Sequence, residues 1–225
     1  FRMSAVRPLE MARKRRPWHT PRIELLGRIE DPYILPLPRW KRAIDVAISG
    51  LALIALAPVF AVTALLIKLS STGPVFYVQK RAGAGGRPFD FIKFRSMVVD
   101  ADRLKEQLRS ENEQDGPVFK MRRDPRVPRI GRIIRQFSID ELPQFWNVLR
   151  GDMTLVGPRP PTLDEVPRYE GWVRRRLEAT PGITCTWQVC GRSKVTFKDW
   201  VRLDIQYLQR RSPLRDFSLL LRTVP

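Results

Sequence analysis

The most restrictive feature of this sequence is an unbroken run of 22 uncharged residues from Val46 to Ile67. A membrane-spanning helix needs about 20 mostly apolar residues, so the run is long enough to cross a bilayer. Pro58 lies in the middle of the run. Its ring removes a backbone hydrogen bond and clashes with the preceding turn, so the helix should kink there. Each half then has about 10–12 residues, or roughly 15–18 Å, which is the depth of one leaflet.

Basic residues flank this run on both sides: Arg39, Lys41 and Arg42 precede it, and Lys68, Lys80 and Arg81 follow it. A crossing helix carries its positive excess on the cytoplasmic side, and these flanks show no such asymmetry. We therefore predict a re-entrant helix hairpin that enters the membrane, bends at Pro58 and returns to the same side, in preference to a straight span. A buried core helix is the less favoured alternative, because all faces of the run are apolar.

The amino-acid composition limits the chemistry that the chain can carry. It has two cysteines, Cys185 and Cys190, and one histidine, His19. This inventory excludes a disulfide framework, a zinc site made from four cysteines or from paired Cys and His, and a His-based catalytic triad. The 41 Lys and Arg residues against 23 Asp and Glu give a net charge of +18, which predicts an anionic partner: nucleic acid, an anionic membrane surface or a phosphorylated substrate.

The chain divides into three predicted parts. Residues 1–38 are basic and rich in proline without sustained periodicity, so we interpret them as a linker within a longer protein. Residues 39–72 form the predicted hairpin, and residues 73–225 have the pattern of a small soluble domain. The expected fold class is therefore α/β: a mixed soluble domain joined to a proline-broken re-entrant membrane helix hairpin.

Local patterns predict several elements of the soluble domain. The strands Val75–Arg81 and Phe89–Phe94 should form a β-hairpin around a glycine cluster at 83–86, which we interpret as a plain turn rather than a phosphate-binding loop. A polar helix is expected over Asp100–Asn112. Leu142, Phe145, Trp146 and Leu149 recur with helical spacing before Gly151, which should close that helix. The segment from Trp187 to Arg192 is expected to be a strand that runs into a turn.

The segment from Lys120 to Arg135 contains seven Lys and Arg residues and a single acid, Asp124. Guanidinium groups bind phosphate oxygens through two parallel hydrogen bonds, so a diphosphate or a lipid headgroup would suit this segment, and a solvated basic face is an equal alternative. The arginines that recur at every third residue and would form a ridge on a helix are Arg126, Arg129, Arg132 and Arg135.

Asp140 and Glu141 follow this basic segment. Ser138 and Glu141 match a helix capping box, in which case the two acids would only complement the helix dipole. Pro143 argues against that interpretation, because it fits better as the first residue of the helix. The two carboxylates would then lie just ahead of the helix, where Mg²⁺ could join them to a diphosphate. The surrounding positive charges should keep Asp140 ionised.

Taken in order, several motifs resemble the catalytic module of the monotopic phosphoglycosyl transferases, also called the bacterial sugar transferase family. The extended C-terminal part, with Asp199-Trp200 and Leu203-Asp204, is similar to the long members that transfer a hexose-1-phosphate to a polyprenyl phosphate. The other motifs that carry the resemblance are Lys41-Arg42…Asp45, the proline-broken run, Gly73-Pro74-Val75-Phe76, Lys93-Phe94-Arg95-Ser96-Met97, Asp140 to Gln144, Asn147 to Asp152, Gly157 to Pro160, Pro181 to Thr184 and Gln188…Gly191-Arg192.

The resemblance implies transfer of a hexose-1-phosphate from a UDP-sugar to undecaprenyl phosphate, with release of UMP. The reaction would be the first membrane step of exopolysaccharide, O-antigen or capsule assembly, at the cytoplasmic face of a bacterial inner membrane. The resemblance further implies a requirement for Mg²⁺ held by Asp140 and Glu141. Asp140 would be the nucleophile that forms a phosphosugar ester, and Glu141 would handle the metal or a proton. The sugar is not specified, and a homodimer is left open.

The resemblance also implies a set of substrate-binding residues: Lys93, Arg95, Arg135, Arg159 and Arg192. Of these, Lys93 and Arg95 could instead hold the structure. Ala57-Pro58 departs from the Ser-Pro common in the family, and Cys185 and Cys190 occupy positions where Gly and a small polar residue are expected. The competing functions are a basic nucleic-acid-binding protein and a membrane-anchored interaction module. No nucleic-acid partner is expected, because no base-reading or stacking module is visible and the apolar run would be unexplained.

Overall fold

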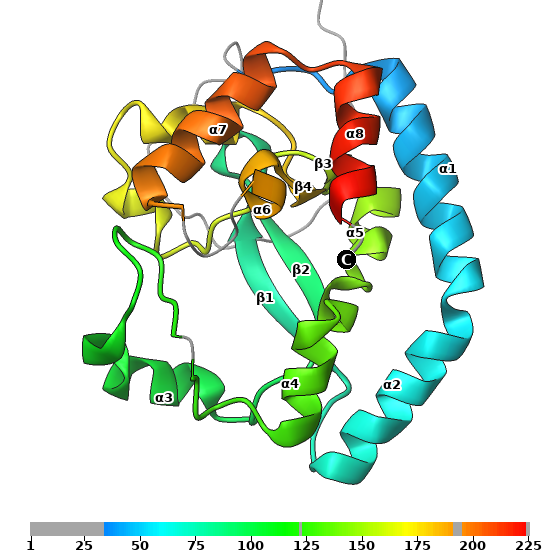
Figure 1. The fold of residues 1–225 in the computed structure, drawn as a ribbon, viewed down its shortest axis with the longest axis vertical. Coiled ribbons are helices and arrows are strands. Elements are labelled where there is room, and N and C mark those ends of the chain that lie inside the picture. The colour runs from blue at the N-terminus through cyan, green and yellow to red at the C-terminus, as the bar shows by residue number, and fades with distance from the viewer. Residues whose placement is uncertain (1–33, 122, 191–194, 224–225) are drawn as a thin grey trace, which may run out of the picture.

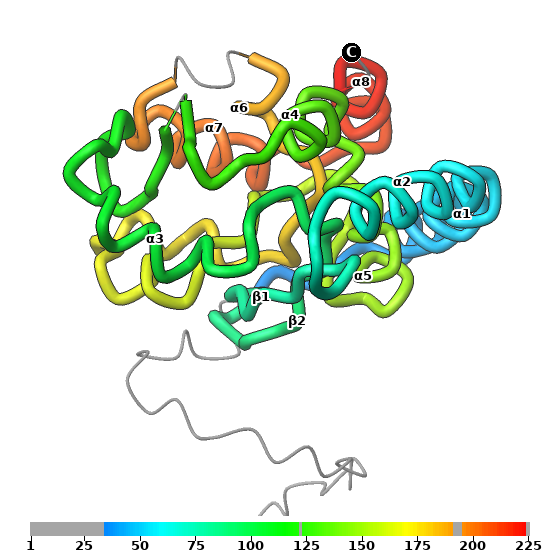
Figure 2. Tube along the Cα trace, turned by 90° about the horizontal axis from the view of Figure 1, so that it is seen from below, coloured from blue at the N-terminus to red at the C-terminus, as the bar shows by residue number. Residues whose placement is uncertain are grey.

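A bent pair of helices runs along one side of a mixed helical and β domain in the computed structural model, which describes residues 34–121, 123–190 and 195–223 (Figure 1). The expected mixed α/β class is confirmed at this level. Figure 2 shows the bent pair at the edge of the molecule rather than in its interior. The part of the predicted linker up to residue 33 lies outside the described residues.

The bent pair consists of α1 (Arg39–Ala55) and α2 (Ala57–Ser70), which meet at Leu56 with a bend of 59°. Pro58 falls in the first turn of α2, where its missing N–H would have no partner in the helix anyway. The predicted break is therefore present, but a bend of this size turns the chain without reversing it. Within the described ranges, no single helix is long and apolar enough to cross a membrane, whereas the two together pass the same test of length and composition.

The first half of α1 is attached to the domain through polar side chains on one face. Lys41 is buried and pairs with Asp216 of α8 (Pro213–Thr223). The Arg42 guanidinium donates to two carbonyls in the last turn of α5 (Gln144–Arg150), at 2.5 and 2.6 Å. Asp45 accepts a hydrogen bond of 2.9 Å from the backbone N–H of Leu155. The charged motif at the start of the apolar run thus docks α1 onto the domain.

Two small sheets organise the domain. Strands β1 (Phe76–Ala82) and β2 (Pro88–Phe94) form the predicted antiparallel hairpin, joined by a 3₁₀ turn at Ala84–Gly86. Strands β3 (Thr154–Val156) and β4 (Gly182–Thr184) pair in parallel. A Cβ on Gly182 would lie 2.1 Å from the nitrogen of Gly157, so only glycine permits this close approach. The carboxyl ends of β3 and β4 therefore meet at one edge, and the loop with Arg159 leaves from there.

The remaining helices cover these sheets. The main core joins β2 to β3, α5, α7 and α8 through buried Phe91, Val148, Met153, Leu155 and Tyr207. Gly151, with φ +88°, ends α5 as predicted. The polar helix expected over Asp100–Asn112 is present as α3 and a 3₁₀ turn. The bounds of the other elements are α3 Ala101–Gln107, 3₁₀ Arg109–Glu111, α4 Arg129–Gln136, 3₁₀ Val166–Arg168, 3₁₀ Val173–Glu178, α6 Thr186–Cys190 and α7 Phe197–Gln209.

One local prediction was wrong. Residues Trp187 to Cys190 belong to helix α6 rather than to a strand, while Gly191 and Arg192 lie outside the described residues. The pairing of β3 with β4 ends at Val156 and Thr184, and no described strand pairs with the chain beyond that point.

The helix predicted before Gly151 is present as α5, with Trp146 exposed and the polar residues Gln144 and Asn147 buried. Asn147 bonds the backbone of β2, donating to Asp90 at 2.6 Å and accepting from Ile92 at 3.1 Å.

Candidate active site

Asp140 and Glu141 lie in a 3₁₀ turn, Ile139–Glu141, directly before α5. Ser138 has left-handed backbone geometry (φ 55°) and makes no capping bond with its side chain, so the capping-box alternative is wrong. Pro143 immediately precedes the first helical residue, one position earlier than predicted. The two carboxylates are therefore just ahead of the helix, as the position of proline indicated.

Glu141 is held by Arg159 through both of its carboxylate oxygens. The Arg159 Nη2 and Nη1 atoms donate to Oε1 and Oε2 at 2.5 and 3.3 Å. Burial by itself would raise the pKa of Glu141, but the charge and hydrogen bond of Arg159 outweigh burial and lower it to about 2. Burial likewise works against the charge of Arg159, yet Glu141 raises the pKa of the guanidinium above its ordinary value. The pair is therefore ionised throughout the physiological range.

Asp140 has the opposite electrostatic environment although it is the neighbouring residue. Its side chain is buried, and burial followed by the negative charge of Glu141 raises its pKa above the ordinary value. Lys93, Arg135 and Arg159 act in the other direction without overcoming these effects. The positive charges therefore do not dominate the pKa of Asp140, because the strongest cation contact goes to Glu141. That Asp140 is ionised stays a prediction.

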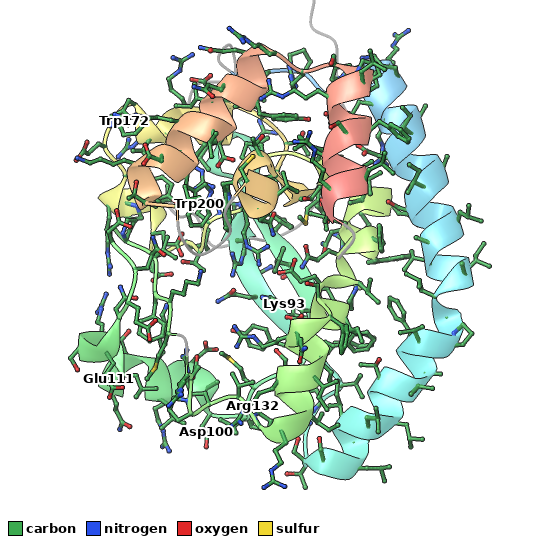
Figure 3. The ribbon with its side chains drawn as sticks, viewed as in Figure 1. Lys93, Asp100, Glu111, Arg132, Trp172 and Trp200 are labelled. Atoms are coloured by element: carbon green, nitrogen blue, oxygen red, sulfur yellow. The ribbon has the colours of Figure 1, made fainter. Side chains whose placement is uncertain are left out.

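Lys93 projects from β2 in the view of Figure 3. Its Nζ lies 5.3 Å from the centroid of the fully buried Phe91 ring. Burial lowers the pKa of Lys93 to about 8, with further lowering from Arg81 and Arg159, while Glu141 and Asp140 oppose the change. The ammonium group is therefore close enough to both carboxylates to interact with them electrostatically.

Helix α4 carries the basic ridge in a shorter form than predicted. The helix exposes Arg129, Arg132 and Arg135. The charge of Arg135 lowers the pKa of Asp140, against the effect of burial. Arg126 lies before the helix and is buried, with its Nη2 and Nε atoms 2.6 and 2.8 Å from the Asp124 carboxylate. Arg126 therefore forms a structural ion pair with Asp124, which lies two residues earlier in the sequence.

Two other predicted substrate-binding residues lie apart from this cluster or outside the described ranges. The Arg95 guanidinium donates to the carbonyls of Thr72 and Ser71 at the end of α2, the latter at 3.1 Å. These contacts hold structure, and substrate binding by Arg95 stays a prediction. Arg192 falls within residues 191–194, outside the described residues.

Arg81 is a member of the site that the sequence reasoning missed. Its Nη1 donates to the Pro160 carbonyl at 2.7 Å, and its Cζ lies 4.7 Å from the centroid of the Phe91 ring that also contacts Lys93. Burial and the nearby charge of Arg159 lower the pKa of Arg81 to about 10. The alternation of the predicted hairpin could have found it, since Tyr77, Gln79 and Arg81 share the more buried face of β1.

The carboxylate oxygens of the site are ligands of the kind that hard cations bind. In the part of the chain that the structure describes, no group of three or more His, Cys, Asp or Glu residues could form an all-protein metal cage. Mg²⁺ is commonly held by one or two carboxylates together with substrate phosphates and water, and an ionised carboxylate can accept about four hydrogen bonds or ligand contacts. Asp140 and Glu141 therefore fit the magnesium site that the resemblance implies, with Glu141 retaining free lone pairs beside Arg159.

Comparison with known proteins identifies relatives over most of the chain. The profile of the family described as "Bacterial sugar transferase" matches residues 37–225. Galactosyl transferase CpsE of Streptococcus agalactiae is 46% identical over 187 residues, covering 82% of this chain and 41% of that protein. Exopolysaccharide production protein ExoY of Sinorhizobium fredii is 39% identical over 189 residues, covering 82% and 84%. The UDP-glucose:undecaprenyl-phosphate glucose-1-phosphate transferase of Caulobacter vibrioides is 40% identical over 205 residues, covering 84% and 72%. The chain thus spans less than half the length of CpsE.

Proposed function

The chain belongs to the bacterial sugar transferase family, and from this premise we propose that it transfers a hexose-1-phosphate from a UDP-sugar to undecaprenyl phosphate, releasing UMP. The observation that carries the proposal is the pair of adjacent carboxylates with opposite environments, one held by Arg159 and the other buried beside Lys93. The name of the Caulobacter relative, which specifies UDP-glucose and undecaprenyl phosphate, supports this donor and acceptor. The product would enter exopolysaccharide or capsule synthesis.

The transfer would take two displacements at the same phosphorus atom. An oxygen of the Asp140 carboxylate attacks the β-phosphorus, the bond from that phosphorus to the bridging oxygen breaks, and UMP leaves with the bonding electrons. A phosphosugar ester of Asp140 remains. A phosphate oxygen of undecaprenyl phosphate then attacks this phosphorus, and the Asp140 carboxylate is released.

The electrostatics favour Asp140 over Glu141 as the nucleophile. Both oxygens of Glu141 are engaged by Arg159, and its lowered pKa makes it a weak base. Asp140 has a raised pKa, so its carboxylate form is more basic and has more to gain from bonding to phosphorus. Glu141 would instead keep Arg159 in place beside the reacting carboxylate.

The cations of the site would bind and stabilise the diphosphate. The positive charges of Lys93, Arg135 and Arg159 all act on Asp140. Fixed positive groups in a partly buried site stabilise the negative charge that develops as UMP departs. When bound by Asp140 and Glu141 together with substrate phosphates, Mg²⁺ would add further charge neutralisation.

We further propose that α1 and α2 form a re-entrant anchor in the inner membrane, with the catalytic domain on the cytoplasmic face. Leu51 and Ile54, next to the bend, are 70% and 77% exposed. The opposite ends of the pair both pack on the same domain, α1 against α5 and α2 against α4. Apolar side chains exposed at the bend and two ends on one body support entry into the lipid from one side.

The test is UMP release by the full-length protein in membrane fractions, with undecaprenyl phosphate and a panel of UDP-sugars that includes glucose, galactose and N-acetylated hexoses. We expect release with a subset of donors, and none from the Asp140→Asn variant. Failure of every donor would contradict the proposed reaction. Binding to mixed DNA with a steep salt dependence, without turnover, would favour the nucleic-acid-binding alternative.

A further inference from the structure

The backbone around Arg159 is hydrogen-bonded at four consecutive carbonyls. Those of Pro158 and Pro161 accept from the backbone N–H groups of Gly182 and Ala82, at 2.9 and 3.0 Å. The carbonyl of Arg159 itself accepts from Arg176 Nη2 at 3.0 Å, and the carbonyl of Pro160 from Arg81 Nη1 at 2.7 Å. Because the flanking prolines have no N–H, these carbonyls are the main groups through which the segment can be held.

Arg81 is itself fixed in three ways. Its backbone forms a bridge with Thr162, just beyond the proline-rich segment. Its Nε donates to the Gln79 side chain at 3.0 Å, and its guanidinium stacks against the buried ring of Phe91. A side chain held by backbone pairing, a hydrogen bond and a cation–π contact presents its remaining donors in one direction.

Arg81 and Arg176 donate hydrogen bonds to neighbouring carbonyls, but of the two only Arg176 has a carboxylate partner within the described residues. Arg176 forms a buried ion pair of 2.9 Å with Asp204. Arg81 has no carboxylate within ion-pair distance among residues 34–121, 123–190 and 195–223. The half-buried guanidinium of Arg81 is compensated by the more distant charges of Glu165 and Glu141. Partial burial of a charge without a direct partner is costly, so the position calls for a reason that packing alone does not supply.

We propose that Arg81 is a positioning residue, which fixes the Pro160 carbonyl and thereby directs the Arg159 guanidinium onto Glu141. Two hydrogen bonds connect these residues in series: Arg81 donates to the Pro160 carbonyl at 2.7 Å, and the neighbouring Arg159 donates to Glu141 at 2.5 Å. With Glu141 occupied in this way, Asp140 is left as the carboxylate free to react. This inference rests on the proposed function for its kinetic consequences, but the contact itself does not.

The test is a double-mutant cycle between Arg81→Met and Arg159→Met, with UMP release as the readout. Because an error of about 1 Å in a positioned group can cost about 100-fold, we expect Arg81→Met to lower kcat/KM by about 10- to 100-fold, mainly through kcat. In the Arg159→Met background the same change should cost less than about twofold, because nothing is left to position. Arg81→Lys, which keeps the charge and a donor, should recover most of the activity.

The matched control is Lys80→Gln, on the adjacent residue of β1, whose exposed side chain pairs with Asp90 at 2.7 Å. It should leave the kinetics unchanged. Losses that multiply fully in the Arg81/Arg159 double variant, or a loss confined to KM for the UDP-sugar, would mean that Arg81 binds substrate directly and would overturn the proposal.

A cycle on thermal stability separates this inference from the proposed function. If the wild-type protein releases no UMP, the proposed function fails, while the contact can still be tested by melting the same four proteins. Coupled residues give non-additive effects, so the double variant should melt within about 2 °C of the less stable single variant. Fully additive shifts would overturn the positioning role, whatever the activity.

Discussion

Replacing Arg159 with methionine would leave a half-buried carboxylate without its counter-ion. The side chains of Glu141 and Arg159 are 20% and 18% exposed, so solvent screens them only in part. Arg159 also interacts favourably with Asp140, but its hydrogen bonds go to Glu141. Methionine keeps most of the volume and removes both the charge and the donors. The perturbation is therefore electrostatic rather than a loss of packing.

The magnitude follows from the pKa of Glu141. Burial alone raises this pKa, so the lowering from 4.5 to about 2 is the net result after Arg159 has overcome it. In Arg159→Met the pKa of Glu141 should therefore rise toward its ordinary value, with the charges of Lys93 and Arg81 still lowering it. One pKa unit corresponds to about 1.4 kcal/mol, and partial exposure reduces the effect, so we expect a loss of about 2–3 kcal/mol of stability near neutral pH.

The assay is stability as a function of pH for the wild type and the variant in the same detergent or lipid disc. A carboxyl group whose pKa is lowered by folding stabilises the protein above its unfolded pKa, and this contribution disappears as pH falls through the folded value. The wild type should therefore lose this contribution between about pH 4.5 and 2. In the variant the pKa of Glu141 lies closer to its unfolded value, so this pH-dependent contribution should be smaller and should disappear at a higher pH.

A control isolates the orphaned charge. In a Glu141→Gln background, Arg159→Met should cost much less, because no carboxylate is then left unpaired. If Arg159→Met has the same stability and the same pH dependence as the wild type, the ion pair contributes nothing and the reasoning is refuted. An equal cost in both backgrounds would refute it as well, since the loss would then come from packing.

Four further outcomes test the site and the anchor. Radiolabelled UDP-sugar without lipid should label the wild-type protein with an equal release of UMP, and Asp140→Asn should take up no label; label on another residue would refute this nucleophile. Activity should vanish in EDTA and return with Mg²⁺, and full turnover in EDTA would show that protein cations suffice. Burial lowers the pKa of Lys93 to about 8, so kcat/KM should fall as the pH rises through 8. Lys93→Arg should move this alkaline fall in kcat/KM to higher pH, and a fall at the same pH in the variant would exclude Lys93 as its origin. Cysteines near Arg39 and Thr72 should be labelled from the cytoplasmic side only, and labelling from opposite sides would establish a span.

The elements that sequence reasoning predicted well are those with a local cause. Alternating residues around a glycine cluster were sufficient for the β1–β2 hairpin, and Pro58 was sufficient for the break between α1 and α2. Helix α6 was missed because its helical state depends on where the β3–β4 pairing stops, which is a relation between residues about 30 positions apart. Arg126 was misassigned because every-third spacing cannot reveal that a side chain folds back onto Asp124.

The site shows the same division between local and long-range causes. The place of Asp140 and Glu141 ahead of α5 could be deduced from Pro143, because proline geometry is local. The partner of each carboxylate could not be deduced, since Arg159 comes from the loop after β3 and Lys93 from β2. Arg81 was missed for a related reason: its role depends on a contact with Pro160, 79 residues away.

The proposed division of roles between the two carboxylates rests on a single long-range contact. Asp140 and Glu141 are neighbours in one turn, so burial and helix position act on both in a similar way. Only Glu141 receives the two hydrogen bonds of Arg159, and its negative charge then adds to the effect of burial on Asp140. Arg159 therefore lowers the pKa of one carboxyl group directly and leaves the other as the stronger base. If Arg159 bonded Asp140 instead, the same sequence motif would place the stronger base at Glu141. The proposal of Asp140 as the nucleophile therefore depends on where the loop after β3 directs its arginine.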